Sequence, residues 1–479
     1  MNKFKLFIEN FFVYGLGGII SKIIPLIMIP IITRLMPNST YFGISDMSNT
    51  IISFASALAI LGMYDAMYRF FFEKDDEENK KKVCSTTLFF TLITSIIISI
   101  VIILFKEKIS QLFFGSIEYQ NIVIITALVT LVVATNNIIS APTRMQNKRG
   151  TFLIVNTVSS ILSYAIAIPL LLKGHYLIAL PLASAISGTI IELAFAYMNR
   201  KWFSIKRFDK KILKQLLIIA IPLFPNFLVY WIYNSFDKVM ITNILGIGEA
   251  GIYAIGAKIG AISQLIYTAF AGGWQYFSFS TMNEKDQVKS NSLIFEYLGI
   301  ISYIATILMC FFSHSIFKIL FEEEYLRAHV IAPYLFMAPL LLMMFQVACN
   351  QFLIIKKTWP NLFILITGAI INVILNYVLI PILGIEGAAI STLIGYIISD
   401  IIVIIVLQKM KLMIVTKRLL ITGVTVLLYI PLWRIFLKDN ILIHLIAIIS
   451  IMILYITLYK SEILQLFNNL RKSKEKVNG

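Results

Sequence analysis

Lys22 is a basic residue near the centre of an almost wholly apolar stretch, GLGGIISKIIPLIMIPIITR, at residues 15–34. A lysine at the middle of a bilayer costs on the order of 3 kcal/mol, so it needs a compensating environment. Small and polar residues recur along this stretch at helical spacing, namely Gly15, Gly18, Lys22 and Pro25. We expect Lys22 to line a cavity and bind an anion. Snorkelling to headgroups and a structural ion pair are the alternatives.

Lys258 is a second basic residue in an apolar run, YAIGAKIGAISQLIYTAF, about nine residues from the expected outer end. At this depth an anion-binding role and snorkelling are equal alternatives. Gly256, Gly260 and Tyr267 lie on nearly the opposite helical face. If Lys258 faces a cavity, those three residues are expected to pack against protein.

Arg69 and Arg34 complete the set of candidate anion-binding residues. Arg69 follows Asp65 by four residues near the expected cytoplasmic end of the second apolar run, a spacing that also suits a local ion pair. Arg34 stands at the outer end of the first run, where a plain interfacial anchor is the alternative.

Three further acids lie in apolar surroundings and are candidates for coupling or structural roles. Asp237, in NSFDKVMI, could hold the neighbouring Lys238. Glu192 and Asp400 are each isolated within long apolar runs, 208 residues apart. Buried carboxyl groups of this kind can carry a coupling proton, and the alternative is a protonated acid with a purely structural role.

The composition identifies the fold class that must position these residues. Hydrophobic residues make up 59% of the 479, charged residues only 14%, and the mean hydropathy is +0.85. Apolar runs long enough to span a bilayer as helices recur along the whole chain. They are centred near residues 20, 57, 94, 131, 161, 187, 227, 264, 301, 341, 370, 397, 426 and 449. We predict an all-α polytopic membrane protein with about 14 transmembrane helices.

The basic residues follow the topology of such a protein. The net charge is +16, and with a cytoplasmic N-terminus most of the lysines and arginines fall on the cytoplasmic side. We therefore expect both termini in the cytoplasm and no nucleic-acid partner. Three separated cysteines and four scattered histidines indicate no metal, cofactor or disulfide framework.

Internal repetition divides the expected helices into two lobes. ITRLMPNSTYFGI (32–44) pairs with ITNILGIGEAGIYAI (241–255), and IPLLLKGHYLIALPLASAIS (168–187) corresponds loosely to IPILGIEGAAISTLIG (380–395). Both offsets are close to 210 residues, so two six-helix units related by an axis along the membrane normal flank a central cavity. The expected divisions are residues 1–200 (N-lobe), 201–213 (cytoplasmic linker), 214–408 (C-lobe), 409–460 (two extra helices) and 461–479 (basic cytoplasmic tail).

The stretch YNSFDKVMITNILGIGEAGIYAIGAKIG resembles the polysaccharide flippases of the multidrug/oligosaccharidyl-lipid/polysaccharide exporter superfamily, the Wzx-type O-antigen or capsule repeat-unit flippases. The family's pattern is matched by Asn234, Asp237, Leu245, Gly246, Gly251, Tyr253 and Lys258. ITRLMPNSTYFGI, LGMYDAMYRFF and IPILGIEGAAIST are similar to the family as well.

The resemblance implies a transporter of the bacterial cytoplasmic membrane and no enzyme. Its expected cargo is an undecaprenyl-pyrophosphate-linked oligosaccharide, moved from the inner to the outer leaflet for surface polysaccharide assembly. Helices 1, 2, 7 and 8 would line the cavity, and Lys22 and Lys258 would neutralise the pyrophosphate. Membrane lipids, a polysaccharide polymerase and glycosyltransferases are the partners it implies.

Three other functions stay open at this point. A drug/cation antiporter of the same superfamily should place unpaired acids in the cavity, whereas the deepest clear charge is Lys22. A lipid II flippase handles nearly the same carrier lipid. A membrane glycosyltransferase or polymerase needs paired carboxylates in an external loop, and the acidic loop EKDDEENKKK (73–82) is short and reads as a solvated turn.

Overall fold

The computed structural model describes residues 23–267, 284–357, 359–438 and 440–462, together with 270, 274, 278, 281, 282 and 464. Lys22 and most of its surrounding stripe lie outside these residues. Helices dominate the described chain, which contains no strand. Eleven helices are long and apolar enough to span a membrane, or twelve when one bent pair counts as a single span. The fold class, a multi-pass helical membrane protein, is confirmed.

The predicted number of fourteen spans stays a prediction, because two of the apolar runs lie partly outside the described residues. The apolar runs centred near residues 20 and 264 extend into segments that the structure does not describe. The other twelve runs match the eleven helices and the bent pair. A shorter apolar helix, Ile23–Arg34, is the described part of the first run.

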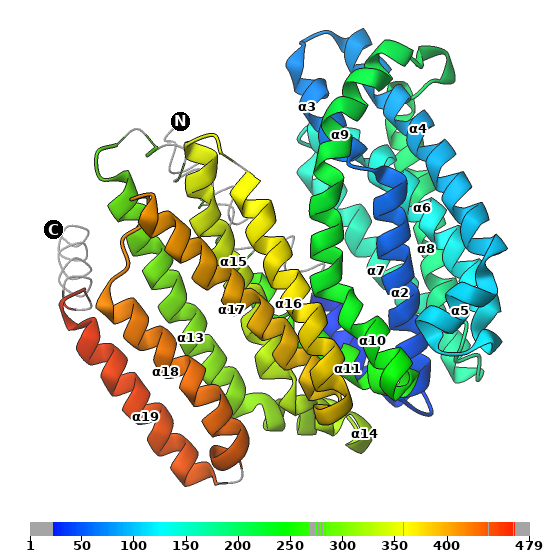
Figure 1. Ribbon diagram of the computed structural model, residues 1–479. Coiled ribbons are helices and arrows are strands. Elements are labelled where there is room, and N and C mark those ends of the chain that lie inside the picture. Colours follow the sequence, from blue (N-terminus) through cyan, green and yellow to red (C-terminus); the bar gives the residue numbers. More distant parts are fainter. Residues whose placement is uncertain are drawn as a thin grey trace, which may run out of the picture.

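The helices form two bundles (Figure 1). The N-lobe contains α2 (Ser39–Ile60), α3 (Met63–Glu73), α4 (Glu77–Leu104), α5 (Lys106–Phe114), α6 (Gln120–Met145), α7 (Arg149–Leu172) and α8 (Ala179–Asn199). Next come α9 (Lys210–Trp231), α10 (Asp237–Leu245), α11 (Ile247–Gly260), α13 (Gln287–Leu320), α14 (Glu323–Leu326), α15 (Ala332–Ile354), α16 (Trp359–Leu383), α17 (Ile385–Lys409), α18 (Lys417–Leu432) and α19 (Ile441–Leu458). The helix Ile23–Arg34 lies where the lobes meet, with Ile29 and Ile32 in a core cluster that contains residues of both.

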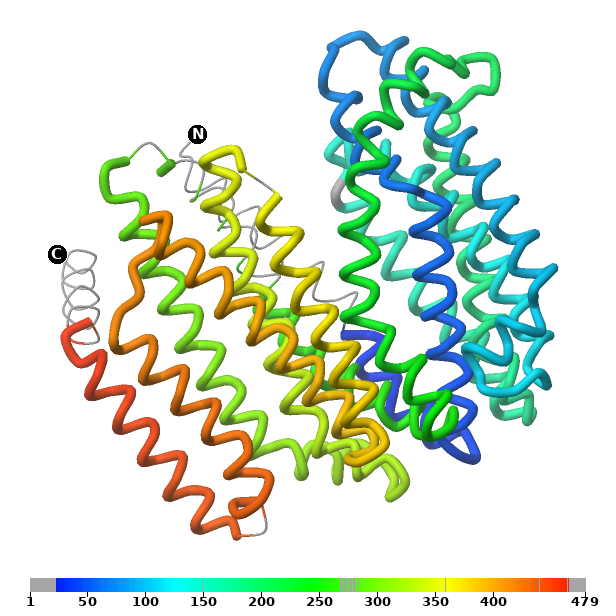
Figure 2. The backbone as a smooth tube through the Cα atoms, viewed as in Figure 1, coloured from blue at the N-terminus to red at the C-terminus, as the bar shows by residue number. Residues whose placement is uncertain are grey.

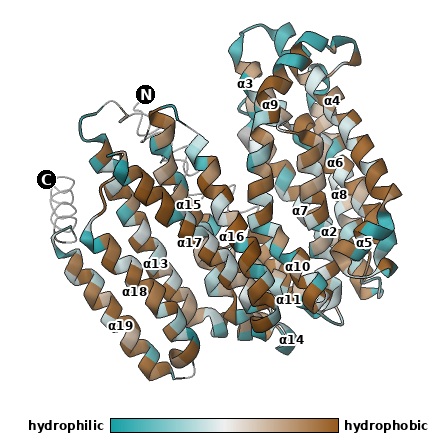
Figure 3. Cartoon of the chain, in the orientation of Figure 1, coloured by the Kyte–Doolittle hydropathy of each residue, from teal (hydrophilic) through white to brown (hydrophobic). Residues whose placement is uncertain are grey.

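The two bundles meet at one end and diverge toward the other. In Figure 2 they touch near the lower end, around α2, α10 and α11, and they spread apart toward the upper end. Hydrophobic residues cover most of the helix lengths, while hydrophilic residues gather at the upper end of the N-lobe (Figure 3). We refer to the lower end as the closed end and to the upper end as the wide end.

Two glycines let the lobes approach closely at the closed end. A Cβ on Gly43 of α2 would collide with the carbonyl oxygen of Ile247, and a Cβ on Gly251 of α11 would collide with that of Ser39. The contact is reciprocal, because Ser39 and Ile247, like Gly43 and Gly251, are 208 residues apart. A self-complementary contact of this kind is expected where two copies of one unit meet at a two-fold axis. It confirms the pseudo-symmetric lobes.

The span Lys210–Leu245, which we call helix seven because it is the seventh in the predicted order, crosses from one lobe to the other. It is distinct from the element labelled α7. Its first half, α9, packs against α3 and α4, with Leu216 and Ala220 buried beside Met63 and Val83. A π-helical turn at Ile232–Phe236 then leads into α10, which packs against α11 and α16. The chain therefore passes from one lobe to the other within helix seven, between α9 and α10. The boundary between linker and C-lobe at residues 213 and 214 stays a prediction.

The segment between the repeats is held on the N-lobe. The backbone N–H of Ser204 donates to Ser85 Oγ. The backbone N–H of Asp209 donates to Thr86 Oγ1. Asp209 also caps α9, and the N–H groups of Ile212 and Lys211 hold the pKa of its carboxyl below the ordinary value. The start of helix seven is thus fixed to the N-lobe.

Two ion-pair clusters fasten α18 and α19 to the C-lobe. Near the wide end, Glu296 of α13 accepts hydrogen bonds from Thr416 at 2.9 Å and Tyr459 at 2.6 Å, and Arg418 lies 3.4 Å away. Near the closed end, Arg434 donates two hydrogen bonds to Glu386 of α17, at 2.6 and 2.8 Å. The two extra helices therefore have specific contacts at both ends.

Candidate interlobe anion site

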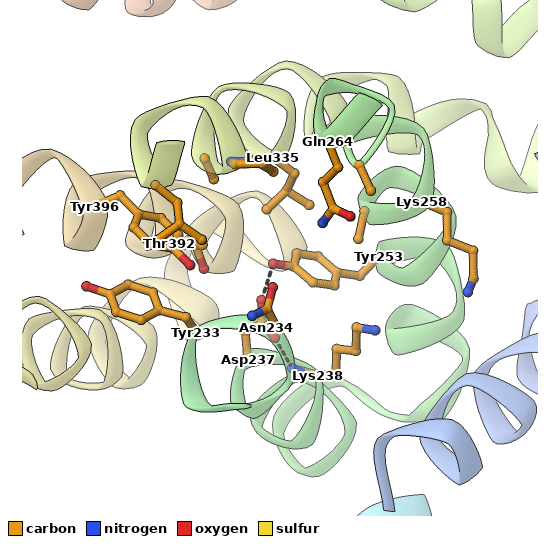
Figure 4. A pocket seen from close by; sticks show the side chains of 15 residues that line it. Tyr233, Asn234, Asp237, Lys238, Tyr253, Lys258, Gln264, Leu335, Thr392 and Tyr396 are labelled. Atoms are coloured by element: carbon orange, nitrogen blue, oxygen red, sulfur yellow. Dashed lines mark hydrogen bonds between the residues drawn. The ribbon is translucent and has the colours of Figure 1, made fainter. Parts of the chain in front are cut away.

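A cavity of about 220 Å³ is lined by C-lobe residues alone, and it opens beside the place where Lys238 and Lys258 contact Asp46 of the N-lobe. Its walls come from the π-helical turn and α10, from α11 and from α15 and α17. The polar and aromatic side chains that line it are Tyr233, Asn234, Asp237, Lys238, Tyr253, Lys258, Gln264, Thr392 and Tyr396 (Figure 4). Four of the residues that carry the family resemblance are among them, namely Asn234, Asp237, Tyr253 and Lys258.

The π-helical turn brings adjacent parts of helix seven to this cavity. π-turns inside α-helices are rare and occur often at functional sites, because the extra residue changes which side chains share a face. Tyr233 stacks on Tyr396 with ring centroids 4.1 Å apart, and its hydroxyl lies 3.2 Å from Ser399 Oγ. These contacts fix the turn against α17, so that Asn234 and Lys238 also face the cavity.

Both cavity lysines share one carboxylate from the opposite lobe. The ammonium of Lys238 lies 2.7 Å from Asp46 Oδ2, and that of Lys258 lies 3.1 Å from Asp46 Oδ1. Asp46, on α2, is only 5% exposed, whereas the Lys258 side chain is 37% exposed. A buried charge pair of this kind persists only when each partner compensates the other. The contact therefore joins the lobes electrostatically and depends on their being closed.

Asp237 contacts Lys238 through the backbone and not through the ammonium group. It accepts a hydrogen bond from the Tyr253 hydroxyl and, at 2.8 Å, one from the backbone N–H of Lys238. The ammonium of Lys238 binds Asp46 instead. Asp237 is thus a buried acceptor that fixes Tyr253 and the start of α10.

Lys258 faces the cavity, and the glycines on the opposite face of α11 pack against protein, as the sequence predicts. A Cβ on Gly256 would collide with the side chain of Ile331, and one on Gly260 would lie 2.8 Å from the backbone of Leu335. Both glycines therefore pack closely against protein, on the side away from Asp46.

Arg34 and several neighbours hold the lobes together below the lysines. Arg34 donates to the carbonyl oxygens of Ile319 and Leu320 at 3.4 Å, so it contacts the C-lobe. Ser39, at the start of α2, donates its N–H at 3.0 Å and its hydroxyl at 2.7 Å to Glu324. Asn243 donates to the carbonyl oxygen of Leu112 at 2.7 Å. These hydrogen bonds connect the two lobes at the closed end.

Arg69 and Asp65 lie far from the lysines, on α3. Both side chains are exposed, and no ion pair joins them within 4.0 Å in the described part of the chain. The bend of 43° between α2 and α3, at Leu61 and Gly62, turns this segment away from the axis of α2.

The remaining two acids lie within their own lobes. Glu192 is half-buried and accepts a hydrogen bond from Thr135 at 2.5 Å. Asp400 is 6% exposed, and neither of its carboxyl oxygens has a hydrogen-bond partner among the described residues. Neither acid lines the interlobe cavity.

Asp46 is the main residue that sequence reasoning missed. It is an isolated acid within an apolar helix, which is the same signal that marked Glu192 and Asp400. The sequence marks Lys238 only as the neighbour of Asp237. Among the described residues no group of three histidine, cysteine or acidic side chains could hold a metal ion.

Comparisons with known proteins agree on a family and a fold. The family model for polysaccharide biosynthesis proteins matches residues 7–274, more than half of the chain. An uncharacterised membrane protein of Methanocaldococcus jannaschii is 30% identical over 208 residues. These residues are 42% of this chain and 41% of that protein, so the match spans less than half of this curated relative.

Two solved structures resemble the whole chain at low identity. The lipid II flippase MurJ, in an inward closed conformation, matches with a TM-score of 0.70 and 17% identity, over 94% of this chain and 99% of that one. An inward-facing multidrug resistance MATE family transporter of the MOP superfamily matches with a TM-score of 0.61 and 17% identity, over 82% and 98%. At these identities the likeness shows a shared fold.

Proposed function

We propose a transport mechanism for this chain from the family to which it belongs, the polysaccharide biosynthesis proteins. The family match agrees with the resemblance found in the sequence, and the fold is MurJ- and MATE-like. We propose that the chain is a flippase-type exporter of the MOP superfamily. Our proposal is that it moves an undecaprenyl-pyrophosphate-linked oligosaccharide from the inner to the outer leaflet of a bacterial cytoplasmic membrane. Both termini and the wide end face the cytoplasm in this proposal.

The observation that carries the proposal is the pair of lysines on one interlobe carboxylate. Asp46 belongs to the N-lobe, while Lys238 and Lys258 move with helix seven and α11. Opening of the closed end would separate Asp46 from both ammonium groups and leave two uncompensated positive charges. Buried charges without partners are costly, so an incoming anion would be favoured at that moment.

A pyrophosphate headgroup is suited to replace Asp46. It carries about two negative charges and several acceptor oxygens, and hydrogen bonds between ionised groups are stronger than neutral ones. Its binding to Lys238 and Lys258 would compete with Asp46 and so weaken the contact that holds the lobes closed. Ligand binding and lobe opening are then coupled through one set of charges.

The direction of transport agrees with the membrane potential. Outward movement of a negative charge past an inside-negative potential of 100 mV releases about 2.3 kcal/mol per charge. The lipid tail would stay in the bilayer while the headgroup crosses between the lobes. A cation carrier would need free acids in the cavity. The acid that lines it, Asp237, already accepts a hydrogen bond from Tyr253, and Asp46 beside it is paired with both lysines.

The other candidate residues have supporting roles in this proposal. Lys22 would add positive charge on the first helix, and Arg34 would hold the closed end. Glu192 and Asp400 are proposed as coupling or structural acids within the two lobes. Contact with a polymerase or glycosyltransferases belongs to the same proposal.

Replacing both cavity lysines is expected to stop transport. Lys238→Ala with Lys258→Ala should lower the rate at least tenfold, since each charge-assisted hydrogen bond contributes roughly 1.5–3 kcal/mol. The assay uses proteoliposomes that contain labelled undecaprenyl-pyrophosphate-linked oligosaccharide. Membrane-impermeant periodate added outside reports which leaflet holds the sugars.

The control is Lys173→Ala, which removes an exposed lysine at the end of α7 and should leave the rate unchanged. Lipid II tested in parallel separates the two flippase functions, because faster transport of lipid II would favour that substrate. Transport by the double variant at the wild-type rate would overturn the proposed role of the lysines.

A further inference from the structure

One face of α3 combines aromatic rings with charged groups and has no partner in the described protein. Its exposed residues are Asp65, Tyr68, Arg69 and Phe72. They follow the i, i+3, i+4, i+7 spacing of a single helical face, and we call this surface the α3 face. Met63, Met67 and Phe71, on the other side of the helix, are buried.

From the position of α3 we infer that this face lies toward the space between the lobes. α3 packs against α4, α6 and α9, so those helices cover its other sides. In Figure 1 it lies on the side of the N-lobe that faces the C-lobe, at the wide end. Asp65 is eight residues before the end of α3, about 12 Å along the helix.

The charges on the α3 face argue against contact with lipid tails. Asp65 and Arg69 are exposed and have no ion pair within 4.0 Å among the described residues. Charged side chains within membrane spans almost always face protein or a water-filled space, because exposure to lipid is costly. Tyr68 and Phe72 are 37% and 59% exposed on this same charged face. Their rings therefore face the same hydrated space.

A row of neighbouring rings, tilted against one another, and one guanidinium hold the exposed rings in place. The Arg144 guanidinium lies 4.6 Å from the Phe152 ring centroid and 4.9 Å from that of Tyr64. Tyr64 lies 6.0 Å from Tyr68, which lies 5.6 Å from Phe72. Aromatic and cation–π contacts each stabilise a fixed ring orientation. The surface is thus arranged before a ligand binds, which lowers the entropic cost of binding.

We propose that the α3 face is a carbohydrate-binding subsite for the oligosaccharide part of the cargo, an inference that rests on the proposed function. A flat ring offers an apolar surface to the C–H face of a pyranose. A carboxylate and a guanidinium supply the acceptors and paired donors that sugar hydroxyls need. A lipid tail would use neither charge, and a phosphate alone would use neither ring.

This subsite is separate from the lysines. Asp46 and Asp65 are 19 residues apart on consecutive helices of one bent span, roughly 28 Å by helical rise. The pyrophosphate and the distal sugars therefore have different contacts. Loss of the α3 face is expected to affect cargo according to the length of its sugar chain.

The test compares two cargoes in the periodate sidedness assay. One is the undecaprenyl-pyrophosphate-linked oligosaccharide, and the other is undecaprenyl pyrophosphate carrying a single sugar. Tyr68→Leu with Phe72→Leu keeps apolar side chains but removes both rings. We expect about tenfold slower transport of the oligosaccharide, from the loss of two ring contacts, and an unchanged rate for the single sugar.

Two further variants serve as controls. Tyr68→Phe with Phe72→Leu retains one of the two rings and should transport the oligosaccharide faster than the double leucine variant. Tyr377→Leu makes the same change at a tyrosine of α16 that is 74% exposed, and it should have no effect. An equal loss for both cargoes in the double variant would indicate a structural or interfacial role and would overturn the subsite. An unchanged oligosaccharide rate would also overturn it, whereas failure of the wild type to move either cargo would overturn the transport function itself.

Discussion

Asp46→Asn is expected to abolish transport while the protein still inserts and folds. The change keeps the shape of the side chain but removes the charge that both Lys238 and Lys258 contact. Removing one partner of a buried ion pair typically costs 3–5 kcal/mol. Because this cost falls only on the closed arrangement of the lobes, we expect the closed end to open without cargo. The periodate sidedness assay would then show no net export.

The matched control for this variant is Asp75→Asn. Asp75 pairs with Lys80 at 2.6 Å, but its side chain is fully exposed on the wide end of the N-lobe. Solvent-exposed ion pairs contribute little, so transport should stay at the wild-type rate. If Asp46→Asn also transports normally, the interlobe ion cluster has no part in the mechanism.

A disulfide across the closed end is expected to stop transport reversibly. A Cβ on Gly248 of α11 would lie 3.4 Å from Thr40 Oγ1 of α2, close to the spacing that a disulfide needs. Thr40→Cys with Gly248→Cys should cross-link under oxidation and bring transport to background. Reduction should restore it, because the lobes can separate again.

The native cysteines do not interfere with this experiment. Cys84, Cys310 and Cys349 are buried and unpaired. Each single variant, treated with the same oxidant, shows the effect of the substitution alone. Full transport by the cross-linked double variant would mean that the closed end need not open.

The architecture was largely predictable because its signals are local or periodic in the sequence. Twelve predicted apolar runs coincide with the described spans. The predicted repeat offset near 210 residues agrees with the reciprocal contact between Gly43 and Gly251, which are 208 residues apart. Glycines at a helix crossing are informative because nothing larger fits. Helical spacing put Gly256 and Gly260 on the face opposite Lys258, and in the structure both glycines lie against protein while Lys258 lines the cavity.

The ion cluster was harder to predict because its partners come from different lobes. Asp46 and Lys238 are 192 residues apart, and no spacing rule connects them. The π-helical turn that presents Lys238 breaks the regular 3.6-residue period, so the helical face could not be inferred. The crossing of helix seven depends on the packing of α9 against α3, which hydropathy alone does not specify.

In the proposed mechanism a pyrophosphate headgroup replaces Asp46 on Lys238 and Lys258, and this exchange opens the closed end. Spin labels at Lys173→Cys and Lys438→Cys, exposed positions on the N-lobe and the C-lobe, allow the separation of the lobes to be measured by pulsed electron resonance. Undecaprenyl-pyrophosphate-linked oligosaccharide should lengthen this distance. With Lys238→Ala and Lys258→Ala the distance should not respond to cargo. An unchanged distance in the otherwise unaltered protein, or equal lengthening with undecaprenol alone, would contradict the account.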